Sequence, residues 1–264
     1  MLKKKVVYTA LTGSYDNLVQ HTYVDPSYDY ICFSNDFKEK KIGIWTIKRI
    51  PFETRDVQLL SRYPKLQPYK VLPEYELSLY VDANVDIKTP YVFQRIEEFD
   101  REGVVLAGVK HQTNNCLYAE SLKVLLNGKE KNSSLVKKQM SLYKAEGFPL
   151  NYGMYEANVI FRRHNNEQVV KQCDDWWFYR VNYSKRDQLS YSFTLWKNSI
   201  PFTYLLPENQ STRNSSEIAC YVHPSKDSYV VHRIKNVYFK FVMPLLFKLY
   251  FPLYYRRLRG SANG

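Results

Sequence analysis

Short apolar stretches that each end in polar residues recur along the first third of the chain. In the clearest of them, Leu77–Val81, apolar residues alternate with Ser78 and Tyr80, which predicts a short and largely buried strand. The strand runs directly into three side chains with oxygen ligands, Asp82, Asn84 and Asp86. Open α/β sheets bind ligands at the carboxyl ends of their strands, and such oxygens suit Mg²⁺ or Mn²⁺. The pattern therefore indicates either a metal site or an acidic surface turn.

Two earlier stretches have the same design. Lys5–Leu11 is an apolar strand that leads into a turn containing Thr12, Gly13 and Tyr15. The first turn of a doubly wound sheet commonly contacts a nucleotide, because small side chains and backbone N–H groups allow close approach. The turn is therefore a candidate nucleotide contact, and the alternative is an ordinary tight turn. Tyr28–Phe33 is a second apolar strand, and it ends in the polar residues Ser34, Asn35 and Asp36.

Helical and strand patterns alternate along the rest of the chain. The expected elements are a strand over 45–50, helices over 54–63 and 91–101, a strand over 103–109, polar helices within 123–143, a strand over 159–161, a helix that contains 176–179 and an apolar run over 189–196. This alternation favours an α/β fold. No Gly-x₄-Gly-Lys or Gly-x-Gly-x-x-Gly motif is present, which argues against kinases and dinucleotide-dependent oxidoreductases.

The composition allows one large domain and points to an anionic partner. A chain of 264 residues, 45% of them hydrophobic, can bury a full core, and we expect this domain to span residues 1–234. The formal net charge of +12 suits a nucleic acid, a membrane surface or a phosphorylated substrate. No zinc, helix-turn-helix or RNA-binding motif is present, so nucleic acid is not expected. The four scattered cysteines form no disulfide or metal pattern, which favours reduced thiols in the cytoplasm.

Residues 235–264 differ in composition from the rest of the chain. The stretch has no acidic residue, and its cations are spaced among Phe, Tyr and Leu. This mixture suits a membrane-surface segment, with rings at the headgroup level and cations on anionic lipid. The alternative is a tail that packs on the domain. Pro244 and Pro252 are expected to break any long helix, and no stretch reaches the ~20 apolar residues of a spanning helix.

The residues before Asp82 add a resemblance to a known class of enzyme. Three features occur in the order found in nucleotide-sugar glycosyltransferases of the GT-A fold: Arg62, Leu72-Pro73 and Leu79–Asn84. In those enzymes an Arg-bearing helix and a Leu-Pro turn lead to a strand that ends in an Asp-x-Asp metal motif. The resemblance implies that Asp82, Ala83 and Asn84 lie beside Mn²⁺ or Mg²⁺ bound to a nucleoside diphosphate sugar. Asn84 departs from the usual second Asp, and a neutral amide is a weaker ligand than a carboxylate.

The resemblance extends over most of residues 5–235, and it implies a GT-A-like (Rossmann-like), mixed and mostly parallel sheet flanked by helices. It is closest to a glycosyltransferase-like family long described as a domain of unknown function, with plant members linked to cell-wall polysaccharide and bacterial members in capsule loci. Cys116, Tyr118 and Glu120 match that family in a Cys-x-Tyr-x-Glu segment, whereas Gln112 replaces its usual proline.

The resemblance also implies roles for further residues. The donor contacts expected at strand ends and on the following helix are Thr12, Gly13, Tyr15, Ser34, Asn35, Arg62, Lys65, Asp82, Ala83 and Asn158. The expected metal ligands are Asp82, Asn84 and a late histidine, His232, although a lone histidine after a strand more often has a structural role. The expected catalytic residues are Glu156, Asp187 and Gln188. Asp187 would act as a base on the acceptor hydroxyl in an inverting enzyme, or face the anomeric carbon in a retaining one.

The sequence thus predicts a metal-dependent glycosyltransferase. It would move a sugar from a UDP- or GDP-sugar to a glycan or lipid-linked glycan acceptor, in cell-surface or capsular polysaccharide synthesis. The enzyme is expected in the cytoplasm, at the inner face of the membrane, held on anionic lipid by residues 235–264. The alternative is a non-catalytic membrane-surface binding protein on a degenerate glycosyltransferase fold, which Asn84 favours.

Overall fold

The computed structural model describes residues 4–13, 16–222 and 238–258. The chain divides into two compact units, each described by itself below. Unit 1 comprises residues 1–112, 155–178 and 194–223, and unit 2 comprises residues 113–154, 179–193 and 224–264. The domain expected over 1–234 and the tail expected over 235–264 stay predictions.

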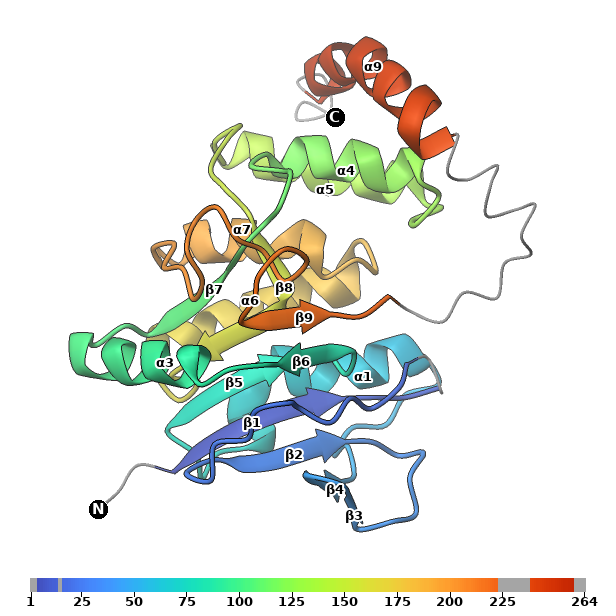
Figure 1. Cartoon of the computed structure of the whole chain (residues 1–264). Helices are drawn as coiled ribbons and strands as arrows, with labels where there is room; N and C mark the ends of the chain where they lie inside the picture. The colour runs from blue at the N-terminus through green and yellow to red at the C-terminus, as the bar shows by residue number, and fades with distance from the viewer. Residues whose placement is uncertain (1–3, 14–15, 223–237, 259–264) are drawn as a thin grey trace. The chain divides into compact units, whose positions relative to one another are not determined.

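A seven-stranded sheet forms the centre of unit 1 (Figure 1). Its strands, in spatial order, are β3 (Lys41–Ile42), β4 (Trp45–Lys48), β2 (Asp29–Phe33), β1 (Lys5–Ala10), β5 (Leu77–Val81), β8 (Tyr155–Arg162) and β7 (Leu106–Lys110). Neighbours among β4, β2, β1 and β5 pair in parallel, and β8 runs antiparallel between β5 and β7. The predicted α/β class with a mixed, mostly parallel sheet is confirmed.

Helices cover both faces of this sheet. Helix α3 (Tyr91–Glu102) buries its apolar stripe in the same core as Val7 and Leu79. On the other face, α1 (Val57–Leu66) and α6 (Glu167–Asn182) meet the buried Arg162 of β8. The Arg162 guanidinium donates to the Tyr8 hydroxyl at 2.6 Å and to the Lys65 carbonyl at 2.8 Å. This charge is therefore hydrogen-bonded inside the fold, as a buried cation has to be.

The strand directions bring the predicted site residues to one edge of the sheet. Because β1, β2 and β5 are parallel, their carboxyl ends meet at the same edge. Strand β8 is antiparallel, so its beginning reaches that edge too, and the Asp82 N–H donates to the Asn158 carbonyl at 2.8 Å. A second, two-stranded sheet pairs β6 (Val85–Ile87) with β9 (Ile218–Cys220). This pairing places the Tyr221 N–H 2.9 Å from the Asn84 carbonyl.

We expect unit 1 to lose stability as the pH falls from about 6.5 to about 4. His21 and His164 are buried, and desolvation lowers the pKa of each to about 4, although Asp86 opposes this at His21. An unfolded histidine has a pKa near 6.5. In this window the unfolded state therefore binds more protons, so the free energy of unfolding falls as the pH falls.

Urea titrations at about pH 7 and about pH 5 measure this loss. The variant His164→Gln keeps polar atoms near Ser78 and the Leu72 carbonyl. Its free energy of unfolding should change less between the two pH values than that of the native chain. An unfolding midpoint that is the same for the native chain at both pH values would contradict the expectation.

The described part of unit 2 is helical. It includes α4 (Leu117–Leu126), α5 (Ser133–Ala145), the start of α7 (Gln188–Lys197), a π-helical turn (Tyr238–Val242) and α9 (Met243–Arg257). The Tyr254 hydroxyl of α9 lies 2.8 Å from the Ser121 hydroxyl of α4, and the Lys144 ammonium of α5 donates to the Tyr255 carbonyl at 2.8 Å. One face of α9 therefore packs on the other helices of unit 2.

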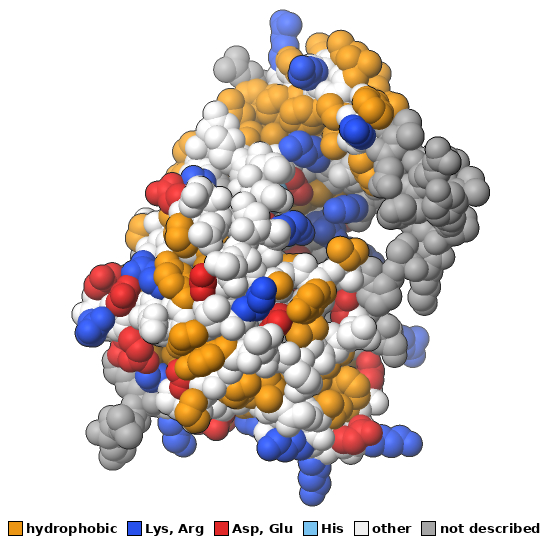
Figure 2. Space-filling view, viewed as in Figure 1, with side chains coloured by type: hydrophobic (Ala, Val, Ile, Leu, Met, Phe, Trp, Pro, Cys, Tyr) orange, Lys and Arg blue, Asp and Glu red, His pale blue; other side chains and the backbone are white. Residues whose placement is uncertain are grey.

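The prediction that Pro244 and Pro252 break any long helix is wrong over residues 243–257. Pro244 lies in the first turn of α9, where a missing N–H leaves no helical bond unmade. Pro252 lies inside the helix, where packing on α4 offsets the one lost bond. Helix α9 also leaves Leu245, Leu249 and Leu253 exposed, and Figure 2 shows hydrophobic side chains gathered with cations over this helix. Within the described ranges, no helix has the length and apolar character needed to cross a membrane.

Candidate functional site

Asp82 is held in a fixed orientation at the end of β5. Its Oδ1 accepts a hydrogen bond from the Tyr80 hydroxyl at 2.6 Å and lies 3.8 Å from the Lys65 ammonium. The Lys65 side chain is only 2% exposed, and its ammonium lies 5.2 Å from the centre of the Tyr80 ring and 5.9 Å from that of Trp176. The predicted diphosphate contact Lys65 thus has an internal partner, and the Asp82 side chain is the exposed member of the pair, at 30%.

Asn84 and Asp86 differ in how many hydrogen bonds their side chains make within the protein. The Asn84 Nδ2 donates to the Tyr221 carbonyl at 2.6 Å, so the amide nitrogen of this side chain is engaged within the protein. The Asp86 carboxylate is 3% exposed and accepts from the Thr22 N–H at 2.7 Å, the Thr22 hydroxyl at 2.8 Å and the Tyr221 hydroxyl at 3.1 Å. Asp86 therefore links the segment that contains Thr22 to the segment that contains Tyr221. Asn84 instead lines a cavity.

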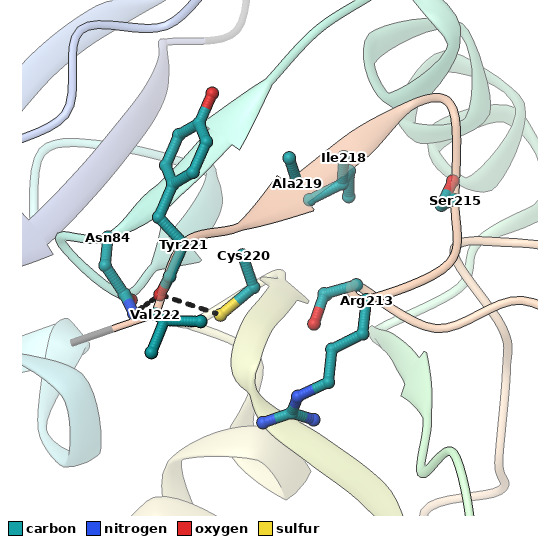
Figure 3. A pocket seen from close by; sticks show the side chains of 9 residues that line it. Asn84, Arg213, Ser215, Ile218, Ala219, Cys220, Tyr221 and Val222 are labelled. Atoms are coloured by element: carbon teal, nitrogen blue, oxygen red, sulfur yellow. Dashed lines mark hydrogen bonds between the residues drawn. The ribbon is translucent and has the colours of Figure 1, made fainter. Parts of the chain in front are cut away.

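That cavity has a volume of about 440 Å³ and lies beside β9 (Figure 3). Its lining comes from Asn84 and from one later segment: Thr212, Arg213, Ser215, Ile218, Ala219, Cys220, Tyr221 and Val222. The β6–β9 pairing brings this segment to the end of β5. The cavity is therefore placed at the sheet edge where the sequence predicts ligand binding.

A buried carboxylate fixes an exposed guanidinium at this cavity. Glu156 lies in β8 and is 3% exposed. Its Oε1 accepts from Arg213 Nη1 at 2.9 Å, and its Oε2 accepts from the Thr212 hydroxyl at 2.6 Å and the Thr212 N–H at 3.2 Å. The Arg213 side chain is 56% exposed, and Asn158 Nδ2 also donates to the Thr212 hydroxyl, at 2.8 Å. The predicted residues Glu156 and Asn158 thus act together on one loop.

The pKa of the Cys220 thiol depends on the charges of Arg213, Asp82 and Glu156. Burial raises its pKa, the positive charge of Arg213 lowers it, and the negative charges of Asp82 and Glu156 raise it. Asp82, Glu156 and Arg213 therefore share one electrostatic environment around the cavity. The sequence did not indicate Arg213, which lies in a polar loop without periodicity. The one available signal was Glu156 itself, because a carboxylate that enters a core strand needs a partner.

The predicted donor contacts at the ends of β1 and β2 join these two strand ends to each other and to α1. Thr12 donates to the Val57 carbonyl at 2.9 Å, and the Gly13 N–H donates to Asp36 at 2.6 Å. Gly13 has φ +73°, and a Cβ there would lie 2.8 Å from Val57 Cγ1, so only glycine fits. Ser34 accepts from the Asp36 N–H at 3.2 Å and Asn35 from the Ile50 N–H at 2.9 Å. Their donor role stays a prediction.

The remaining predicted residues are placed as follows. Arg62 lies in α1 and its guanidinium is 3.5 Å from the Ser61 hydroxyl, and Ala83 is buried. Asp187 directly precedes α7 in unit 2, with Gln188 as the first residue of that helix, and the Asp187 carbonyl accepts from the Ser190 N–H at 3.1 Å. The catalytic role of Asp187 and Gln188 stays a prediction. Tyr15 and His232 lie outside the described residues.

The fold is that of an α/β protein with a cavity beside the carboxyl ends of the parallel strands of its sheet. The chain belongs to the TOD1/MUCI70, glycosyltransferase-like domain family, which matches residues 6–216. This confirms the predicted enzyme class, a glycosyltransferase, at the level of the family. The comparison with curated proteins gave no match.

Several solved structures resemble the chain at low sequence identity. Mouse xyloside xylosyltransferase 1 in its apo form is 10% identical, with 76% of this chain and 84% of that chain covered and a TM-score of 0.44. Core-mannan synthase A from Aspergillus fumigatus in its Mn/GDP form is 12% identical, with 74% and 70% covered and a TM-score of 0.41. An active-site mutant of LgtC is 12% identical, with 88% and 94% covered and a TM-score of 0.43.

Proposed function

We propose that the chain transfers a sugar from a nucleoside diphosphate sugar to a glycan acceptor, with the diphosphate bound between Asp82, Asn84 and Arg213. The observation that carries this proposal is the Glu156–Arg213 pair, in which a buried strand carboxylate aims an exposed guanidinium at the cavity. A guanidinium presents paired N–H donors that match phosphate oxygens. A guanidinium already held in place adds binding energy without the cost of ordering a long side chain.

A divalent cation, Mn²⁺ or Mg²⁺, fits this site if it binds together with the substrate diphosphate. Oδ1 of Asp82 is engaged by Tyr80 and Lys65, which leaves Oδ2, and Asn84 contributes its carboxamide oxygen. Among the described residues there is no group of three or more His, Cys, Asp or Glu that could hold a metal. Mg²⁺ commonly binds through one or two carboxylates together with substrate phosphates. Asp82 and Asn84 would therefore hold a cation that arrives with the diphosphate, and the cation would neutralise the departing diphosphate.

In this proposal Glu156 is a positioning residue. Both of its carboxylate oxygens are occupied by the 212–213 loop, so it acts through Arg213. Lys65 holds Asp82 in place from inside the fold. Asp187 and Gln188 remain the groups proposed to act at the anomeric carbon, and cell-surface or capsular polysaccharide remains the proposed product.

A panel of UDP- and GDP-sugars, with and without Mn²⁺, tests the proposal. We expect one donor to be hydrolysed slowly without acceptor and only in the presence of the metal. The release of UDP or GDP is the measurement, and heat-denatured protein is the control. Metal-dependent binding of a donor without turnover would favour the alternative, a binding protein on a glycosyltransferase fold.

We further propose that α9 holds the chain on the cytoplasmic, anionic face of a membrane. Leu245, Leu249 and Leu253 are each more than half exposed and lie one helical turn apart, beside the exposed Lys248 and Arg256. An apolar stripe flanked by cations suits the membrane interface, where each cation contributes on the order of 1 kcal/mol on anionic lipid.

The double variant Leu245→Glu, Leu249→Glu is expected to release the chain from vesicles of phosphatidylglycerol, because it places two carboxylates where apolar burial is needed. Co-sedimentation at low salt is the measurement, and donor hydrolysis should be unchanged. The matched control is Val24→Glu, Val181→Glu, which changes two exposed valines that are not part of α9. Equal release by both double variants would refute a role for α9.

A further inference from the structure

A second cavity lies wholly within unit 2. Its volume is about 850 Å³, within the range of about 300–1,000 Å³ that is usual for small-molecule sites. Its apolar walls come from α4, α5 and α9: Leu122, Leu125, Leu126, Leu142, Ala145, Tyr250, Leu253, Tyr254 and Leu258. Tyr250 and Leu253 also belong to the exposed apolar face of α9, so the cavity adjoins that face.

The polar lining of this cavity has one sign of charge. Lys137 and Lys138 lie on α5, Arg257 lies at the end of α9, and all three side chains are exposed. Among the described residues that line the cavity, none is acidic. The nearby carboxylate of Glu130 is engaged elsewhere, by the Ser184 hydroxyl at 3.0 Å and the Lys185 N–H at 3.1 Å. Within the described residues, the cavity therefore combines an aliphatic wall with cations and no lining carboxylate.

These walls exclude one kind of occupant. Helices satisfy their own backbone groups, so the sides of α4, α5 and α9 offer no backbone hydrogen bonds to an extended peptide. Hydrogen bonds to an occupant come mainly from side chains, among them the hydroxyls of Ser133 and Ser134, and from N–H groups in the first turn of α5. An occupant must therefore be apolar over most of its length and anionic at a compact polar group.

We propose that this cavity binds a long-chain phosphate monoester, with the alkyl or isoprenyl chain along the leucines and the phosphate at Lys137 and Lys138. Charge complementarity carries the choice of a phosphate, because ammonium groups bind phosphate as point charges. The adjoining apolar face of α9 supplies the route by which such a lipid would leave a membrane surface. The inference concerns binding alone, so it stands or falls independently of sugar transfer.

Farnesyl monophosphate, titrated into the full-length protein in a calorimeter, tests the proposal. We expect saturable binding at one site per chain, with inorganic phosphate and farnesol each at least about tenfold weaker, a difference of about 1.4 kcal/mol. The double variant Lys137→Ala, Lys138→Ala should weaken binding about tenfold, and Ala145→Trp, which fills the cavity from the end of α5, should weaken it at least as much. The matched control Lys88→Ala, Lys171→Ala removes two exposed cations from unit 1 and should bind as the native chain does.

The α9 variant distinguishes binding of a single lipid in the cavity from attachment of α9 to a membrane surface. Leu245→Glu, Leu249→Glu changes the membrane-facing side of α9 and should leave farnesyl monophosphate binding intact, since neither leucine lines the cavity. Farnesyl monophosphate binding that survives Lys137→Ala, Lys138→Ala unchanged would overturn the proposal, as would binding to phosphatidylglycerol vesicles alone. Both lysines are exposed, so their removal tests the site even if Ala145→Trp fails to fold.

Discussion

Asp82→Asn is expected to lower turnover of the nucleotide sugar by about 10²–10³-fold, the range seen when one preorganised electrostatic group is removed from an active site. Asparagine keeps an oxygen that can accept from Tyr80, so the side chain stays in place while its negative charge is lost. The effect should appear in kcat, because the charge acts where the leaving diphosphate is neutralised. Initial rates of nucleotide release at saturating Mn²⁺ measure it.

The substitution Asp82→Asn isolates the effect of the lost charge better than Asp82→Ala does. Both substitutions remove the negative charge that faces the buried Lys65 ammonium, and a buried charge without a partner destabilises a fold. Alanine also removes the oxygen that accepts from the Tyr80 hydroxyl. We therefore expect Asp82→Ala to lower the Tm more than Asp82→Asn does. Glu76→Gln, an exposed carboxylate just before the other end of β5, is the matched control. Turnover of Asp82→Asn within about tenfold of the native value would remove Asp82 from the site.

Arg213→Ala is expected to lower kcat/KM for the donor by about a hundredfold, since a charge-assisted bidentate contact contributes on the order of 1.5–3 kcal/mol. Arg213→Lys should recover only part of this loss, because a lysine lacks the planar fork. The loss should be largest for donors with an intact diphosphate. Steady-state kinetics with the donor found in the nucleotide-sugar panel measure it.

A double-mutant cycle separates the two roles open to Glu156. If Glu156 acts through Arg213, then Glu156→Gln lowers kcat/KM in the native chain but changes it little once Arg213 is alanine. If Glu156 acts on the substrate itself, the two losses multiply, and the catalytic role predicted from the sequence is restored. The Tm of each variant shows how far the 212–213 loop depends on the buried carboxylate.

The position of the site could be predicted from the sequence because it follows from local patterns. Each apolar strand among Lys5–Leu11, Tyr28–Phe33 and Leu77–Val81 is visible in the sequence, and so is the polar residue at its end. Parallel pairing then brings these ends to one edge of the sheet. These patterns predicted an α/β sheet with Asp82 at the end of a strand, whereas the metal and donor roles of Asp82 came from the resemblance.

The walls of the site could not be predicted in the same way. The cavity depends on the pairing of β6 with β9, and Asp86 and its partner Ala219 are more than a hundred residues apart in sequence. The segment that supplies Arg213 is polar and without periodicity, so nothing local marks it. Lys65 is a similar case, because its burial depends on Asp82 and on the rings of Tyr80 and Trp176.

The tail shows how packing overrides local preference. Two prolines favour a broken helix over residues 243–257, yet the contacts of α9 with α4 and α5 keep this stretch in one helix. Sequence composition indicated the apolar and basic character of the segment, and it left open whether the segment contacts a membrane or packs on the domain.

The lining of the first cavity comes almost wholly from one continuous segment, residues 212–222. The contacts of this segment with the rest of unit 1 include the short β9 pairing, the Glu156 carboxylate, and the hydrogen bonds of Tyr221 with Asn84 and Asp86. The turn between β5 and β6 contributes Asn84 to the lining. Exchanging this one segment, as a cassette, would therefore change the shape of the cavity while the seven-stranded sheet stays the same.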